Sequence, residues 1–452
     1  MKHRLDLTKS SVPKTISVMT FNMIIGMLGM VLFNLVDTYF IGKLGTTPLA
    51  SIGFTLPVIM FQGAISLGMG IGASSLISQA IGRKNNNDVL RFTTFALILA
   101  VIIAVFMCIL GLLTINPVFR LLGADENQLE LIREYMIIWY IGVPFVVIPM
   151  VGNHAIRAAG NTAIPSIIML ISVGVNVVLD PLFIFGAGPI SALGLKGAAL
   201  ATVFSRAISL VAALYFLHHR FKMISLKILT LENMLISSKK IFYLGFPAAL
   251  TQMLLPVTMS FVTRIVSSYG EEAVAALGVA NRIEFFAMAP LMALYSVIIP
   301  FTGQNRGAMK IDRISQGIRF SSQFSMILGL LTFLVFLIFA KNIAGIFTSN
   351  PDVIKSVVYY MIIVSIGYGF QGVSGIGAAV FNALHKPLNS AGINAMRLIV
   401  LLIPLVLLGS WTYGLNGIFT GIMLSSVISG ILTFFWLKKS INQILVSEIQ
   451  SE

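Results

Sequence analysis

The stretch TISVMTFNMIIGMLGMVLFNLVDTYFIG, from Thr15 to Gly42, decides what kind of protein this chain forms. It is apolar along almost its whole length and exceeds the roughly 20 residues that an α-helix needs to cross about 30 Å of hydrocarbon. One acidic residue, Asp37, lies near its end. A charge inside a membrane costs at least about 2.5–3.5 kcal/mol, so Asp37 is a candidate functional residue.

Apolar runs of this length recur along the whole chain. Of its 452 residues, 57% are hydrophobic and only 10% are charged, whereas soluble proteins carry about 25% charged residues. Hydropathy predicts about twelve spans, at residues 15–42, 48–80, 92–114, 131–153, 163–186, 194–217, 238–268, 273–304, 316–340, 355–382, 388–409 and 412–437. The sequence therefore predicts an all-α polytopic membrane protein. The first span lacks a small-residue cleavage site, so we expect a retained helix rather than a signal peptide.

The basic residues indicate how the spans are oriented. Assigning alternate loops to alternate sides places 21 of the 30 lysines and arginines on the side of the N-terminus, six on the other side and three inside spans. Basic loops stay in the cytoplasm, so we expect both termini there and the protein in the inner (plasma) membrane. The same bias explains the formal net charge of +14 without a nucleic-acid partner.

Motifs of common enzyme classes are missing from the sequence. It contains no GxxxxGK[ST] phosphate loop, no HExxH or GxSxG motif and no cluster of cysteine and histidine. These patterns mark ATPases, zinc enzymes and serine hydrolases. We therefore expect neither an enzyme nor an organic cofactor.

The two halves of the chain resemble each other. A shift of 225 residues aligns them, and the shift becomes 220 near the end. The matched pairs include Gln79 with Gln304, Tyr135 with Tyr360 and Gly197 with Gly417. Because each half enters and leaves the membrane on the same side, the repeats are parallel. The prediction is two six-helix lobes, residues 1–217 and 238–452, joined by a cytoplasmic linker at 218–237.

Oxygen-bearing side chains gather at one predicted depth of the N-terminal lobe. Asp37 and Asp180 both lie near the outer ends of their spans, and Thr202 lies at a comparable depth. Asn176 precedes Asp180 by four residues, and so shares its helix face. Pro181 cannot donate to the carbonyl of residue 177, which favours a broken helix beside the acid. Such hard oxygen ligands suit a cation such as Na⁺, and the carboxylates could equally carry a proton.

Other roles for the intramembrane charges remain open. Asp37 or Asp180 could be a protonated structural residue, although neither acid has a copy in the second half, which favours coupling in one lobe only. Arg264 and Glu284 are expected to form an ion pair between the seventh and eighth spans, because buried charges normally pair. The alternative is that Glu284 contacts a cation or substrate. Arg206 is interpreted as structural.

Six segments together resemble the multidrug and toxic compound extrusion (MATE) transporters. They cover nearly the whole chain: VDTYFIGKLG, SQAIGRKN, RAAGNTAIPS, NVVLDPLFIFG, GLKGAALATVFSR and PFTGQNRGA. Each is weak alone, but the set is specific. The acidic pair confined to one lobe is most similar to the DinF-type branch.

The resemblance implies a function and a set of residue roles. Family members export cationic or amphipathic compounds in exchange for inward-moving H⁺ or Na⁺. By motif position, Asp37 and Asp180 would be the coupling acids. Asn176 and Thr202 would complete the cation cage, and would serve as Na⁺ ligands with the acids if Na⁺ is used. Asn153 would face the same cavity. The family's first-helix proline is replaced here by Asn22.

Our hypothesis is therefore a secondary antiporter that works by alternating access, a monomer in the lipid bilayer that takes small organic cations or amphipathic drugs. The nearest alternative is a flippase for lipid-linked precursors, which would favour a broadly cationic cleft. The basic residues that are not assigned to loops argue against it, because they number only three: Arg206, Arg264 and Arg282. A membrane scaffold or receptor would leave the converging acids unexplained.

Overall fold

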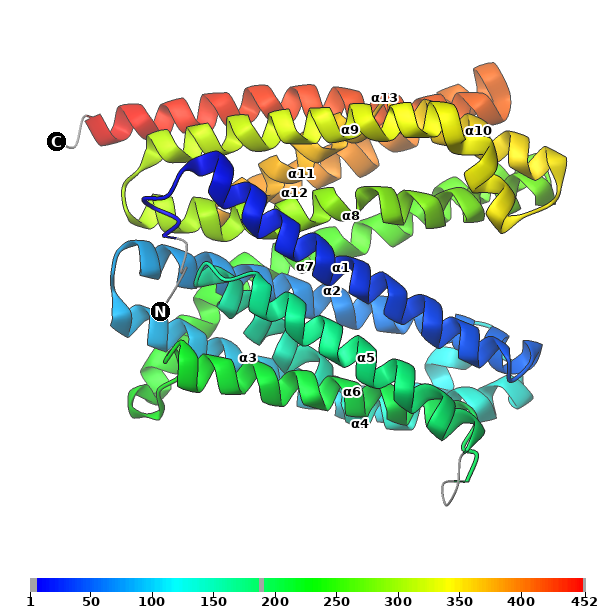
Figure 1. Cartoon of the computed structure of the whole chain (residues 1–452), viewed down its shortest axis with the longest axis horizontal. Helices are drawn as coiled ribbons and strands as arrows, with labels where there is room; N and C mark the ends of the chain where they lie inside the picture. Colours follow the sequence, from blue (N-terminus) through cyan, green and yellow to red (C-terminus); the bar gives the residue numbers. More distant parts are fainter. Residues whose placement is uncertain (1–5, 187–190, 450–452) are drawn as a thin grey trace. The chain divides into compact units, whose positions relative to one another are not determined.

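The computed structural model describes residues 6–186 and 191–449, and these residues are helical almost throughout, with no β-strand (Figure 1). The first half contains α1 (Val12–Gly42), α2 (Thr46–Gly82), α3 (Asn86–Leu121), α4 (Glu126–Ala158), α5 (Ala163–Phe185), α6 (Leu195–Tyr215), η1 (Phe216–Arg220) and η2 (Leu226–Ile228). The second half contains α7 (Leu231–Val266), η3 (Ser267–Tyr269), α8 (Glu271–Gly307), α9 (Ile311–Phe347), α10 (Pro351–Ser365), α11 (Tyr368–Ala383), α12 (Pro387–Ala395), η4 (Met396–Leu401) and α13 (Leu402–Ile449). The predicted all-α class is confirmed.

The number of membrane spans agrees with the prediction. Within the described residues, 10 helices are long and apolar enough to cross a membrane, and α10 with α11 forms a further span bent by 53°. The longest helical stretch, Pro387–Leu445, leaves helical backbone values at Tyr413 and Gly414. It folds back there, because Gly409 and Gly417 on either side of the turn contact each other. Counting it as two spans gives the expected total of about twelve.

The backbone itself carries the internal repeat. Residues with positive φ recur at the predicted shifts of 225 and 220, although several of the matched side chains differ. The pairs are Gly45 (119°) with Gly270 (100°), Lys84 (58°) with Met309 (57°), Gly160 (83°) with His385 (59°) and Gly194 (55°) with Gly414 (58°). Left-handed geometry is unfavourable for residues other than glycine, so its recurrence at Lys84 and Met309 reflects one inherited turn. The repeat predicted from sequence is present in three dimensions.

The chain divides into two compact units whose limits fall inside helices. The N-unit is Asn22–Ala249, and the C-unit comprises the residues up to Phe21 and those from Leu250 onward. The predicted lobe boundaries lie in the connection between α6 and α7. The two compact units instead meet within α1, between residues 21 and 22, and within α7, between residues 249 and 250. In α1 the division falls at Asn22, the position where the family resemblance places a missing proline.

Small residues bring helices of the N-unit into close contact. A Cβ atom at Gly68 would lie 2.6 Å from Ala249, and one at Gly72 would lie 2.6 Å from the carbonyl oxygen of Ile241. The first part of α7 therefore packs directly on α2, the kind of approach that small residues allow in membrane helices. Figure 1 shows α5 and α6 side by side in the same unit.

The N-terminal turn is held against the C-unit by side chains of α8 and α9. Leu7 is fully buried. Its carbonyl accepts hydrogen bonds from Asn305 Nδ2 and an Arg313 terminal nitrogen, both at 3.1 Å. Arg313 also donates to the Ser10 carbonyl at 2.6 Å and to Asn305 Oδ1 at 3.0 Å. The Arg313 guanidinium thus holds the turn before α1 through two direct bonds, and its third bond goes to Asn305, which also binds Leu7.

Arg313→Ala is expected to release this turn. The variant loses charge-assisted hydrogen bonds and leaves carbonyls unsatisfied, which should lower the free energy of unfolding by about 1–3 kcal/mol. Limited proteolysis should then cut the N-terminal segment faster than in the wild type. Arg319→Ala, at an exposed position of the same helix, is the control. Equal cleavage of both variants would show that the bonds do not anchor the segment.

Candidate functional site

The α5 helix provides the most deeply buried acid of the N-unit. Asp180 and Asn176 are both 0% exposed, and Asn176 Nδ2 donates a hydrogen bond to Asp180 Oδ1 at 3.1 Å. This is the bond that the spacing of four residues predicts. The other oxygens, Asp180 Oδ2 and Asn176 Oδ1, are buried without a hydrogen-bond partner.

The predicted break of this helix at Pro181 is wrong. Pro181 lies inside α5, which continues to Phe185. The proline removes one donor, but neighbouring helices can stabilise such a position in a membrane protein. Two of the last carbonyls of α5 are also satisfied, because those of Phe183 and Ile184 accept bonds from the backbone N–H groups of Leu193 at 3.0 Å and Gly194 at 3.1 Å.

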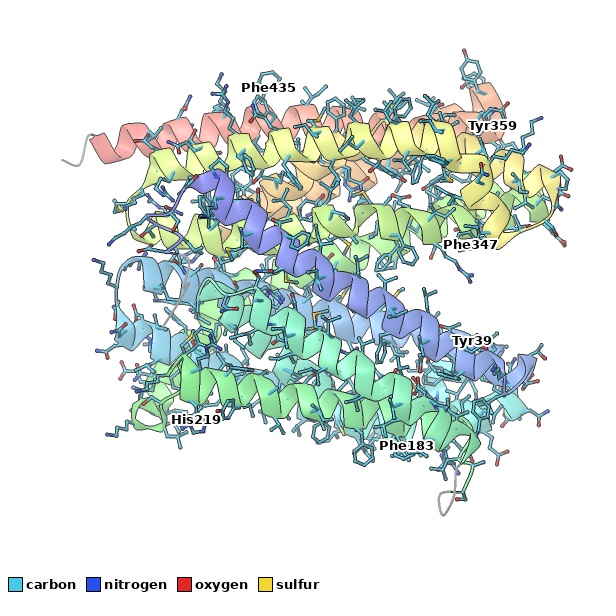
Figure 2. All side chains as sticks on the ribbon, viewed as in Figure 1. Tyr39, Phe183, His219, Phe347, Tyr359 and Phe435 are labelled. Carbon is cyan, nitrogen blue, oxygen red and sulfur yellow. The ribbon has the colours of Figure 1, made fainter. Side chains whose placement is uncertain are left out.

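Asp37 reaches the same region from α1. Its side chain is partly buried, and its Oδ1 atom is buried without a hydrogen-bond partner. Asp37 and Asp180 interact electrostatically with each other. Figure 2 shows Tyr39 and Phe183 toward the same end of α1 and α5, and the two acids precede these rings by two and three residues. The structure therefore brings the two predicted acids together.

A tyrosine that sequence reasoning missed completes this acid cluster. Tyr135 of α4 is 4% exposed and interacts electrostatically with both Asp37 and Asp180. Its repeat partner, Tyr360, donates a hydrogen bond to Glu284 in the C-unit. Each unit therefore places the same repeated tyrosine beside an acid. The alignment of Tyr135 with Tyr360 was the available signal.

Thr202 lies on α6, the helix packed against α5. Ser172 Oγ donates to the Ser205 carbonyl at 3.0 Å, and Ser205 Oγ donates to the Thr202 carbonyl at 2.8 Å. These bonds fix the register of the two helices. Thr202 is buried, but the described residues include no hydrogen bond from its hydroxyl to Asp180. Thr202 therefore lies at the border of the cluster and does not bond to Asp180.

Asn153 lies on α4, well along the helix from Tyr135. It is buried with an unpartnered Oδ1 atom. It follows Tyr135 by 18 residues, which is about 27 Å along a helix. Among the described residues no contact links Asn153 to the acids, and its family-based place in the same cavity stays a prediction.

The C-unit pairs its acid differently from the prediction. Arg264 is exposed on α7, and no Arg264–Glu284 ion pair forms among the described residues. Glu284 instead turns toward α10, where Tyr360 donates to it, and it interacts electrostatically with Arg397 of η4. The expected ion pair is wrong because the two side chains occupy different faces. Arg397 lies within the predicted span 388–409.

The acid cluster presents buried oxygens that lack hydrogen-bond partners. Asp37 Oδ1, Asp180 Oδ2 and Asn176 Oδ1 are buried acceptors that receive no hydrogen bond, and unpaired buried acceptors are unfavourable. A proton on one carboxyl, or a Na⁺ ion between the oxygens, would remove this penalty. The described residues contain no group of three or more His, Cys, Asp and Glu side chains that could hold a metal ion, so the donor set resembles neither a zinc nor a di-iron site.

These features define a class of protein: a multi-pass membrane transporter built from two parallel helical repeats. The MatE family profile matches residues 23–182 and 247–408, which is more than half of the chain. The chain belongs to the MatE family, and like other members it is a membrane transporter and not an enzyme.

Individual relatives match over nearly the full length. The chain is 34% identical over 435 residues to the FAD transporter of Shewanella oneidensis, covering 96% of each. It is 24% identical over 441 residues to the multidrug export protein MepA of Staphylococcus haemolyticus, covering 97% of this chain and 96% of MepA. The crystal structure of the Vibrio cholerae MATE transporter VcmN in its bent form matches with a TM-score of 0.90 and 31% identity, over 96% of this chain and 98% of VcmN.

Proposed function

We propose that this chain is a secondary antiporter that exports amphipathic organic cations from the cytoplasm in exchange for H⁺ or Na⁺. It would act as a monomer in the plasma membrane, with both termini in the cytoplasm, and would belong to the DinF-like branch. The observation that carries the proposal is the pairing of Asp37 with Asp180 in one unit. Glu284 of the other unit is already engaged by Tyr360 and Arg397.

The paired acids supply a mechanism for coupling. Two neighbouring carboxylates in a poorly solvated site repel each other when both are ionised, so one of them tends to take up a cation. A cationic substrate that binds near these carboxylates is attracted by the same negative charge as the coupling ion. Substrate and ion therefore weaken each other's binding, and this reciprocal coupling is what antiport requires.

Transport driven by one gradient at a time tests this proposal. Purified protein is reconstituted into proteoliposomes with a fluorescent organic cation, and a pH gradient or a Na⁺ gradient is then imposed separately. The proposal expects at least one gradient to drive the dye against its own concentration, and the effective gradient identifies the ion. If neither gradient moves the dye while a fluorescent lipid analogue is translocated, the flippase alternative replaces the proposal.

The Shewanella oneidensis relative suggests a second candidate substrate. It is named an FAD transporter, and its 34% identity over 435 residues makes a flavin nucleotide a reasonable second cargo to test here. FAD is larger than typical organic cations and carries an anionic pyrophosphate. Counterflow assays with radiolabelled FAD and with an organic cation, in the same vesicles, separate the two candidates. Saturable FAD exchange without exchange of the cation would favour the flavin nucleotide.

A further inference from the structure

Arg206 of α6 lies on the helix face that borders the acid cluster. It follows Thr202 by four residues, so the two side chains project from the same side of α6. Its guanidinium carbon lies 4.8 Å from the ring centroid of Phe33 on α1. Arg206 also interacts electrostatically with Asp37. Phe33 and Asp37 are four residues apart and share one face of α1. Arg206 of α6 therefore lies opposite both residues.

The guanidinium stacks on a ring but forms no close ion pair and no hydrogen bond among the described residues. Arg206 forms no ion pair with Asp37, and no hydrogen bond from its side chain is found among the side chains that the structure describes. The ring of Phe33 supports the face of the guanidinium through a cation–π contact. Its N–H groups point along the edges of the same plane, where they can bind a carboxylate or phosphate with two parallel bonds.

A purely structural role explains these contacts poorly. An arginine within a membrane span is unfavourable, and it normally pairs with an acid or lines a pathway. Arg206 is only partly buried, so the surrounding helices do not enclose it fully. A guanidinium held by an aromatic ring, with free donor edges and beside Asp37, has the chemistry of a group that recognises an anion.

We propose that Arg206 selects substrates that carry a carboxylate or phosphate in addition to a cationic part. The proposal rests on the antiport function proposed above and names its substrate class: amphipathic zwitterions. The cationic part binds near Asp37 and Asp180, and the anionic group binds Arg206. Phe33, on which the guanidinium stacks, and Asp37 are four residues apart on α1, which corresponds to about 6 Å and sets the approximate separation of the two charged groups.

Arg206 is compatible with antiport for such substrates. The cationic part still competes with H⁺ or Na⁺ at the acids, so binding of one still expels the other. The anionic group adds affinity at a point that the coupling ion does not occupy. The groups that face Asp37 are then Arg206 from α6, Asp180 from α5 and Tyr135 from α4.

A matched pair of dyes tests the role of Arg206. One is a fluorescent aminoxanthene with a free carboxylate, and the other is its methyl ester, which keeps only the cationic part. Efflux of both is measured in proteoliposomes with the gradient that drives the wild type. Arg206→Gln is expected to lower transport of the carboxylate dye about tenfold or more, and to leave the ester within about twofold. Retained ester transport also shows that the variant is folded.

Two further variants and a control sharpen the result. Arg206→Lys keeps the charge but loses the planar fork, so it should restore only part of the carboxylate transport. Phe33→Leu removes the aromatic support of the guanidinium, so it should lower transport of the carboxylate dye more than transport of the ester. Arg282→Gln, at an exposed position of α8, should leave transport of both dyes unchanged.

Any of five outcomes overturns the proposal. In the first, Arg206→Gln affects both dyes equally, which would mean that Arg206 acts on the coupling ion or the fold. In the second, it affects neither dye. In the third, the wild type exports the ester but not the carboxylate dye. Finally, if the wild type exports neither dye, or Asp37→Asn leaves ester export unchanged, the antiport function fails first and the role of Arg206 fails with it.

Discussion

Asp37→Asn and Asp180→Asn are each expected to reduce gradient-driven efflux of an organic cation by about 100-fold. Asparagine has nearly the shape of aspartate but cannot take up a proton or supply a negative charge to Na⁺. The two acids interact with each other, so losing either one removes the competition between ion and substrate. Efflux rates in proteoliposomes, normalised to the amount of reconstituted protein, measure the effect.

The control for this experiment is an acid outside the cluster. Asp312→Asn changes an exposed position in the first turn of α9 and should transport at the wild-type rate. Passive exchange of substrate, without an ion gradient, should survive in the two cluster variants better than coupled efflux does. Wild-type coupled efflux in both Asp37→Asn and Asp180→Asn would remove the acids from the mechanism.

Gly197→Ala should abolish most transport without touching an acid. A Cβ atom at Gly197 would overlap the backbone carbonyl of Phe183, and backbone cannot move aside as a side chain can. The variant must push α6 away from α5, and this type of overpacking costs about 1–3 kcal/mol. The displacement shifts Thr202 and Arg206 relative to Asp180, so we expect efflux to fall more than about tenfold.

Gly174→Ala provides the matched control on α5. No atom lies within 4 Å of a Cβ atom built at Gly174, so alanine fits, and its higher helix propensity should stabilise the helix slightly. Thermal unfolding in detergent and efflux are measured for both variants. If Gly197→Ala keeps wild-type efflux and stability, close α5–α6 packing does not position the site.

The sequence alone predicted the features that depend on composition and spacing. Span number follows from hydropathy, and the repeat follows from matched residues such as Gly194 and Gly414. The Asn176–Asp180 hydrogen bond follows from helical periodicity, because residues four apart share a face. Each of these features depends on residues that are close in sequence or on the internal repeat. None of them requires knowing which helices contact each other.

Features that depend on how helices face one another were not predictable. Arg264 and Glu284 lie on adjacent spans, but the rotation of each helix decides whether they meet, and they do not. The close approach of α1 to α5 is a second example. A Cβ atom at Gly26 would lie 2.7 Å from Ser166 Oγ, so this glycine lets the two helices pack closely. A glycine within a helix does not by itself reveal such a contact.

Ion release on substrate binding tests the central claim most directly. Purified protein in weakly buffered detergent is titrated with an organic cation, while a pH indicator follows H⁺ and a radiotracer follows bound Na⁺. The account predicts that the wild type releases H⁺ or Na⁺ as substrate binds, and that the Asp37→Asn, Asp180→Asn double variant releases neither. Substrate binding that releases no ion from the wild type, or the same release from the double variant, would contradict it.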